Sequence, residues 1–165
     1  MIGSKILRQS PPCGVKLEGT IIGTPLPGTL VMPQPNQGPT VGGRMNWVPL
    51  APSADFSTMP FPGVVVLTED EMQGKTFKDA YVSGTRCFMY APLVGEELNV
   101  VVAQPGTGTG PGFWKPGTPL GAAAANPGQL KIATANPLFV VSEYTSEQPP
   151  TGTLTDIVLA MCCNA

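Results

Sequence analysis

Proline and glycine interrupt this chain so often that a long helix has little room to form. The 165 residues include 20 Gly and 20 Pro, so 40 of 165 positions, about 24%, favour turns, against roughly 12% in average proteins. Such a composition can indicate disorder, but a disordered chain is poor in apolar residues, and this one is 42% hydrophobic. Short apolar runs between turn formers instead predict many β-strands joined by turns.

The clearest strands are predicted in the middle of the chain, between residues 81 and 104. The runs Arg86–Ala91 and Leu98–Ala103 are short and rich in β-branched or aromatic residues, which is typical of strands. Pro92 and the turn at 95–97 separate them, so we expect the two strands to pair in antiparallel fashion. The second run is apolar on both faces, which places it at the centre of a core.

The rest of the chain continues this pattern. Further strands are predicted at 15–23, 29–32, 45–50, 63–67, 118–120, 129–133, 138–143 and 154–163. Pro49 favours an edge position for the strand at 45–50, because proline cannot donate to a sheet. We therefore expect an all-β protein, a small antiparallel β-barrel or β-sandwich with long Pro/Gly-rich loops at 33–44, 51–62 and 104–117. Residues 1–14 are expected to form an extended N-terminal arm, and 15–165 a single β domain.

Charge and residue usage exclude several function classes. Charged residues make up 12% of the chain, the net charge is −2, and basic residues do not cluster, so nucleic-acid binding is not expected. No run approaches the roughly 20 apolar residues that span a membrane. The chain has no histidine, which removes the commonest general base and metal ligand. We expect a protein that is not an enzyme and that uses no cofactor or metal.

Three local motifs bear on possible phosphate, dinucleotide or calcium binding. Gly74-Lys75-Thr76 lacks the earlier glycine of a phosphate-binding loop, because Glu69 stands in its place. The alternating glycines at 106–110 have the wrong spacing for a dinucleotide loop, and the residues after them cannot open a helix. The acidic residues at 69–71 lack calcium-loop spacing and are expected to form a solvated turn.

The four cysteines, Cys13, Cys87, Cys162 and Cys163, fit no zinc spacing. Buried free thiols, as in a protein made in a reducing cytosol, are the favoured interpretation.

A low-charge chain with apolar loops is more stable inside an assembly than as a free monomer. The candidate subunit or partner contacts are Ile6, Leu7, Trp47, Phe56, Met59, Phe61, Phe113 and Trp114. Two alternatives stay open from the residues alone. Phe56, Met59 and Phe61 can instead fold back on the domain's own core, and Trp114 can cover the end of its own barrel.

Several segments resemble the capsid cement, or decoration, proteins of tailed phages. These segments are VSGTR at 82–86, VGEELNV at 94–100, GTPL at 117–120, GQL at 128–130 and FVVSE at 139–143. The resemblance spans about residues 63–163 and is one of pattern. It implies a non-enzymatic structural protein, made in the host cytoplasm, that sits on the outer surface of the virion capsid. Such a protein bridges major capsid protein subunits, commonly as a homotrimer, and stabilises the expanded head.

Two other functions compete with this expectation. A phage or host-surface carbohydrate-binding module would line a groove with aromatic side chains, for which Trp47 and Trp114 are the candidates. A β-sandwich enzyme domain would depend on Glu96 or Glu97.

Overall fold

The computed structural model describes residues 14–34, 43–51, 64–103, 114–122, 126–133, 137–144 and 155–163. These residues form ten strands and one short 3-10 helix, η2 (Glu71–Gln73). The strands are β1 (Val15–Ile21), β2 (Leu30–Pro33), β3 (Asn46–Pro49), β4 (Val65–Leu67), β5 (Arg86–Ala91), β6 (Glu97–Ala103), β7 (Pro119–Ala122), β8 (Leu130–Ile132), β9 (Phe139–Tyr144) and β10 (Thr155–Cys162). The predicted all-β class is confirmed. The strand predicted at 154–163 is β10.

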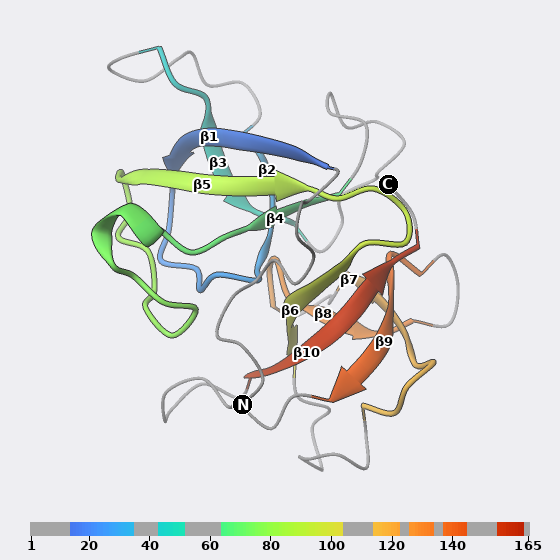
Figure 1. The fold of residues 1–165 in the computed structure, drawn as a ribbon. Coiled ribbons are helices and arrows are strands. Elements are labelled where there is room, and N and C mark those ends of the chain that lie inside the picture. Colours follow the sequence, from blue (N-terminus) through green and yellow to red (C-terminus); the bar gives the residue numbers. More distant parts are fainter. Residues whose placement is uncertain are drawn as a thin grey trace.

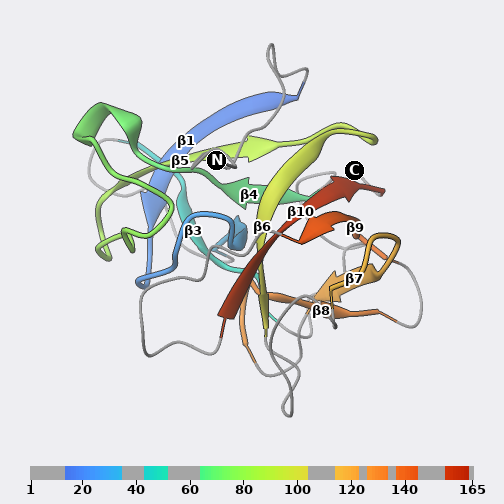
Figure 2. The same ribbon diagram turned by 60° about the horizontal axis from the view of Figure 1, so that its bottom comes forward.

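The strands close into two small barrels that lie side by side (Figure 1). The first has the order β1-β3-β2-β4-β5, and the second has the order β10-β6-β8-β7-β9. Figure 2 shows the same two groups of strands from below, with β6 and β10 next to the first barrel. From the sequence we expected one domain over 15–165, and the described part of it contains two barrels.

The two barrels repeat one topology. In chain order, the first, third, second, fourth and fifth strands of each half are neighbours around the barrel. In both halves the first and third strands are parallel, and all other pairs are antiparallel. The register also agrees. Between the first and third strands, Ile21–Trp47 in the first barrel corresponds to Val102–Leu130 in the second. Between the second and fourth strands, Leu30–Val66 corresponds to Pro119–Val140. Between the first and fifth strands, Lys16–Tyr90 corresponds to Glu97–Met161. The chain is therefore an internal repeat of a five-stranded barrel.

The same tripeptide, Pro-Gly-Thr, leads into β2 and β7, at 27–29 and 116–118. Its glycine N–H donates to the neighbouring strand in each barrel: Gly28 to the Leu67 carbonyl at 2.7 Å, and Gly117 to the Val141 carbonyl at 2.8 Å. Both glycines have positive φ, +88° and +87°, a conformation that side chains with a Cβ disfavour. The repeat therefore extends to the turns.

The predicted pairing of the two central strands is wrong. β5 pairs with β1 and β4, whereas β6 pairs with β10 and β8. The segment between them, residues 92–96, carries the chain from one barrel to the other. Because each strand of a closed barrel uses both of its edges, β5 and β6 are each satisfied within their own barrel.

The predicted edge position of the strand around Pro49 is also wrong. β3 lies between β1 and β2. Pro49 is its last residue, where a missing N–H removes little of the ladder.

The apolar side chains form two clusters. One fills the first barrel with residues that alternate along its strands: Ile21, Val31, Trp47, Val65, Leu67, Cys87 and Met89. The other fills the second barrel and continues into the junction, where it takes in Val66 and Tyr90 from the outer side of the first. Residues Leu98 to Ala103 of β6 are all buried, which confirms the predicted central strand. Burial of each large apolar side chain contributes roughly 1.5–3 kcal/mol.

Candidate contact surface

Within the described residues, no group of three or more His, Cys, Asp or Glu side chains is placed to hold a metal ion. No helix in the described part of the chain is long and apolar enough to cross a membrane.

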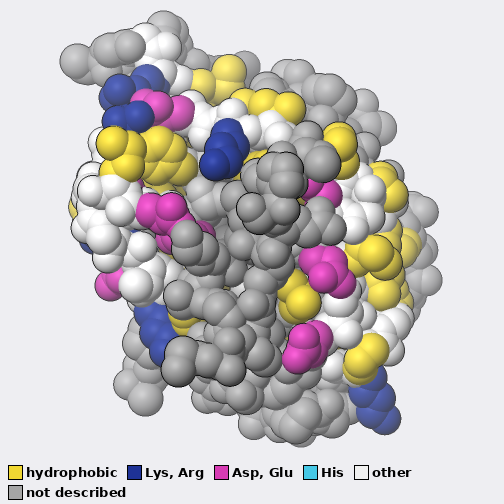
Figure 3. Space-filling view, in the orientation of Figure 1, with side chains coloured by type: hydrophobic (Ala, Val, Ile, Leu, Met, Phe, Trp, Pro, Cys, Tyr) yellow, Lys and Arg dark blue, Asp and Glu magenta, His cyan; other side chains and the backbone are white. Residues whose placement is uncertain are grey.

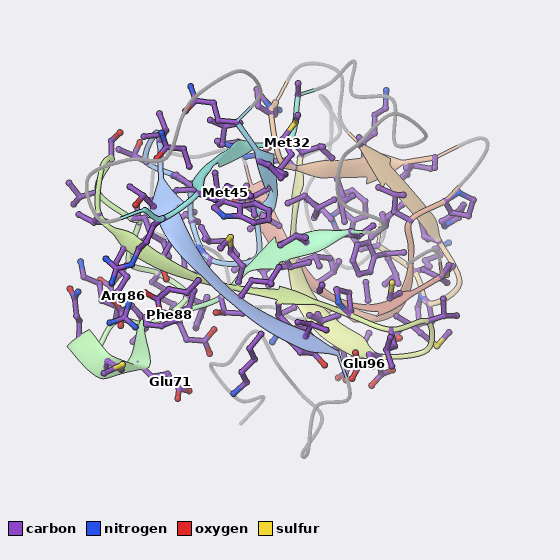
Figure 4. All side chains as sticks on the ribbon, turned by 90° about the horizontal axis from the view of Figure 1, so that it is seen from above. Met32, Met45, Glu71, Arg86, Phe88 and Glu96 are labelled. Carbon is purple, nitrogen blue, oxygen red and sulfur yellow. The ribbon has the colours of Figure 1, made fainter. Side chains whose placement is uncertain are left out.

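The outer side of β1 and β5 carries a charged face, defined here by Lys16, Glu18, Arg44, Arg86 and Phe88. The Glu18 carboxylate lies 2.9 Å from Arg44 Nε and 2.6 Å from Arg86 Nη2. The Arg86 guanidinium also stacks over the Phe88 ring, 4.7 Å from its centroid. Figure 3 shows Lys and Arg side chains gathered with an acidic one at the upper left, over the first barrel. In Figure 4 Arg86 and Phe88 point to the same side of β5.

The two arginines lower the pKa of Glu18 below its ordinary value of 4.5, and the largest cause is the hydrogen bond from Arg86. The arginines favour the ionised form of Glu18. The ion pair is therefore fully present above the ordinary pKa of glutamate, and it is lost as the pH falls through the lowered pKa of Glu18. The Glu18 side chain is 36% exposed and those of Arg44 and Arg86 are 48% and 39% exposed, so the pair orders side chains more than it stabilises the fold.

We expect Arg86→Gln to raise the pKa of Glu18 more than Arg44→Gln does, because Arg86 is the larger cause of the shift. The measurement is an NMR titration of the side-chain carboxyl carbon of Glu18 in the wild type and the two variants. Equal shifts from the two substitutions would contradict the assignment.

A buried polar cluster lies at the opposite end of β1, where the chain leaves the first barrel. The Tyr90 hydroxyl lies 2.7 Å from Glu96 Oε1 and 2.9 Å from Oε2. Leu93 N–H donates to Oε2 at 2.7 Å, and Gly14 N–H donates to Oε1 at 3.2 Å and to the Tyr90 hydroxyl. Tyr90 is 1% and Glu96 6% exposed, and Figure 4 shows Glu96 far from Arg86. This Glu96 cluster fixes the start of β1, the end of β5 and the linker to one another.

Four large apolar side chains surround that junction and are exposed. Val15, Leu93, Val94 and Met161 are 58%, 50%, 65% and 39% exposed. Val15 pairs with Ala91, just before the linker, and Gly95 N–H donates to the Cys162 carbonyl, which brings the end of β10 to the same place. We call these four side chains the junction patch. Exposed apolar side chains that gather at one place are a candidate contact site, whereas single ones are common on any protein surface.

The contact residues predicted from sequence divide into two groups. Trp47 and Trp114 are 2% and 1% exposed and pack into the first-barrel cluster and the shared cluster, respectively. Neither indole lines a surface groove. The other six, Ile6, Leu7, Phe56, Met59, Phe61 and Phe113, lie outside the described residues.

The acidic turn at 69–71 differs from its prediction. Glu69 and Asp70 are buried, and only Glu71 is exposed. Asp70 caps η2, because its Oδ1 accepts from Gln73 N–H at 3.2 Å, and this role draws it inward.

Among the described cysteines, Cys87 and Cys162 are buried, as predicted, and Cys163 is half-buried. Burial raises the pKa of Cys87 to about 12, so its nucleophilic thiolate form is suppressed.

Neither a protein-family model nor a curated protein matches this chain. The junction patch and the charged face are therefore interpreted from their own chemistry. The sequence contained one signal of the patch, the pair Leu93-Val94 between Pro92 and Gly95. Proline and glycine favour a turn there, and side chains in a turn are usually exposed. The Glu18–Arg86 pair had none, because its partners are 68 positions apart.

Proposed function

We propose that this protein is a non-catalytic structural protein that binds the outer face of a phage capsid and cements neighbouring major capsid protein subunits. The observation that carries the proposal is the junction patch. A cement protein needs apolar contact surface on a scaffold that does not deform. The patch provides this, because closed barrels lie on both sides of it and the Glu96 cluster fixes its backbone.

The residues before Gly14 add to this proposal. Gly14 is held beside the patch by Tyr90 and Glu96, and the N-terminal arm expected at residues 1–12 lies outside the described residues. We propose that the arm tethers the protein to a neighbouring subunit. Several modest contacts per protein, repeated in a homotrimer, gain affinity through effective concentration. Binding only the expanded shell then stabilises that shell by mass action.

We do not propose the competing carbohydrate-binding function. Its aromatic candidates, Trp47 and Trp114, are packed inside the protein. The patch around the linker is aliphatic, whereas sugar rings stack best on aromatic faces.

The test is co-sedimentation with expanded heads of the phage that carries the gene, followed by heating to score genome release. We expect wild-type protein to bind and to raise the disruption temperature of the heads. Leu93→Asp with Val94→Asp should reduce occupancy at least about tenfold, since about 1.4 kcal/mol of lost contact energy has that effect. Met72→Asp is the matched control, because Met72 is 79% exposed on η2, outside the patch.

Deleting residues 1–12 should weaken head binding while the circular dichroism spectrum stays that of a β protein. If the full-length protein neither binds heads nor changes their heat resistance, the cement proposal fails. If the patch variant binds as well as Met72→Asp does, the patch is not the contact. Light scattering of the free protein tests the homotrimer.

A further inference from the structure

Main-chain hydrogen bonds join the two barrels where the entry to β2 meets the second barrel. Val101 N–H of β6 donates to the Gly28 carbonyl at 3.0 Å, and Leu30 N–H donates to the Gly128 carbonyl at 2.7 Å. Gly128 N–H donates in turn to the Leu50 carbonyl at 2.8 Å. The entry to β2 therefore lies between the first strand of the second barrel and the residues that precede its third strand. We call this contact the seam.

The seam is a heterologous contact, because it joins different elements of two barrels that share one topology. Contacts of this kind can repeat from copy to copy and generate rings or open filaments. The second barrel carries the corresponding turn, Pro-Gly-Thr at 116–118. Pro27 and Gly28 are buried, whereas Pro116 and Gly117 are exposed. The exposed turn of one copy is thus the element that would add to the first barrel of the next copy.

In the first barrel the receiving position is closed by a hydrogen bond of its own. The register of the two barrels makes Thr20 and Met45 the equivalents of Val101 and Gly128. Thr20 N–H donates directly to the Met45 carbonyl at 3.0 Å, whereas the equivalent N–H and carbonyl of the second barrel each bond to the entering segment. The main-chain donor that would receive a neighbour's turn is therefore already used.

Two residue differences also oppose a repeat of the seam. A Cβ on Gly128 would overlap Thr29 Cγ2 and lie 2.6 Å from the Leu30 carbonyl oxygen, so the close approach at the seam depends on glycine. Met45, the equivalent residue of the first barrel, carries a long side chain that is 50% exposed. Pro119, the equivalent of Leu30, has no N–H to donate to a neighbour's carbonyl.

We propose that Met45, Pro119 and the Thr20–Met45 hydrogen bond form a stop that prevents the seam from repeating between copies of this chain. The stop keeps the exposed turn at 116–118 off the first barrel of a second copy and so blocks head-to-tail growth into rings or filaments. A homotrimer of this chain would then form through another surface. The proposal stands whether or not the partner of the protein is a capsid.

The test removes the stop and follows the mass of the free protein by sedimentation velocity over a dilution series. Met45→Gly with Pro119→Leu supplies a glycine and an N–H at the two positions where the seam has them. We expect this opened variant to form concentration-dependent species of at least about twice the wild-type mass. Adding Pro116→Asp should return it to the wild-type mass, because a charge on the turn would lose its water in the closed contact. Circular dichroism checks that each variant is folded.

Two controls make the outcome decisive. Met72→Gly with Pro119→Leu should keep the wild-type mass, since Met72 is 79% exposed on η2, outside the seam. Pro116→Asp in the otherwise wild-type chain should also leave the mass unchanged, and this arm does not depend on the opened variant folding. A fall in mass from that single change would mean that copies already associate through the turn, and it would overturn the proposal. An opened variant that keeps the wild-type mass, or that grows regardless of Pro116→Asp, would overturn it as well.

Discussion

Glu96→Ala is expected to lower the free energy of unfolding by about 3 kcal/mol or more. The change removes the acceptor shared by the Tyr90 hydroxyl, Leu93 N–H and Gly14 N–H. Leaving a buried donor unsatisfied costs about 1–3 kcal/mol each. For a protein of this size, such a loss corresponds to a fall of about 6–12 °C in the unfolding midpoint. Urea denaturation followed by circular dichroism measures it.

Glu97→Ala is the matched control, since it removes a neighbouring carboxylate that makes none of these contacts. We expect the control to change stability by no more than about 0.5 kcal/mol. A double-mutant cycle with Tyr90→Phe should give a coupling energy of about 1–3 kcal/mol, because the two side chains form one network. Equal losses from Glu96→Ala and Glu97→Ala would show that the cluster does not hold the junction.

The Glu96 prediction also bears on function. Because Glu96 holds Gly14, Glu96→Ala should speed amide exchange at Gly14 beyond the general loss of stability. The backbone at Gly14, next to the junction patch, would then be held less firmly. A head-binding defect in a variant that remains folded would connect the buried cluster to the proposed contact surface.

Most strands could be predicted from sequence because their signals are local. A short apolar run between turn formers identifies β5 or β6 without reference to any partner. Pairing is different. Val15 of β1 lies opposite Ala91 of β5, and Ile157 of β10 lies opposite Val101 of β6. No local sequence signal specifies which distant strand pairs with which, so the prediction that neighbouring strands pair was wrong.

The internal repeat was missed for a related reason. Equivalent positions share topology and register but few side chains, as with Gly19 and Val100 or Trp47 and Leu130. A small barrel tolerates changes of residue identity in its core as long as the total packed volume and the pattern are kept. The Pro-Gly-Thr turn at 27–29 and 116–118 is a sequence signal of the repeat, but the same tripeptide also occurs at 105–107.

Candidate contacts were harder to predict than strands. Trp47 was predicted as a contact because aromatic side chains line carbohydrate-binding grooves, yet it fills the first barrel. Whether an indole points inward depends on space left by a residue far along the chain. Leu93 and Val94, by contrast, are exposed, and the turn formers Pro92 and Gly95 on either side of them are a local signal of that exposure.

The space for Trp47 comes from Gly19. A Cβ placed on Gly19 would overlap the Trp47 indole and lie 2.8 Å from the Met45 carbonyl oxygen, closer than such atoms can approach. In the second barrel the equivalent pair is Val100 with Leu130. A larger residue on the first strand therefore accompanies a smaller one on the third, so that the sum fits the barrel.

Gly19→Ala is therefore expected to lower the free energy of unfolding by about 3 kcal/mol, at the upper end for overpacking. The same substitution in a Trp47→Leu background should lower it by only about 1 kcal/mol further, because the indole that the methyl strikes is gone. The coupling energy of about 2 kcal/mol lies within the range for residues in contact. Gly121→Ala is the control, since its Cβ would meet only the Ala133 Cβ, at 3.1 Å. Urea melts of the four variants and the wild type measure the cycle. If Gly19→Ala lowers stability equally with tryptophan and with leucine at position 47, the two residues do not share one space, and the volume exchange between the barrels is not what sets their packing.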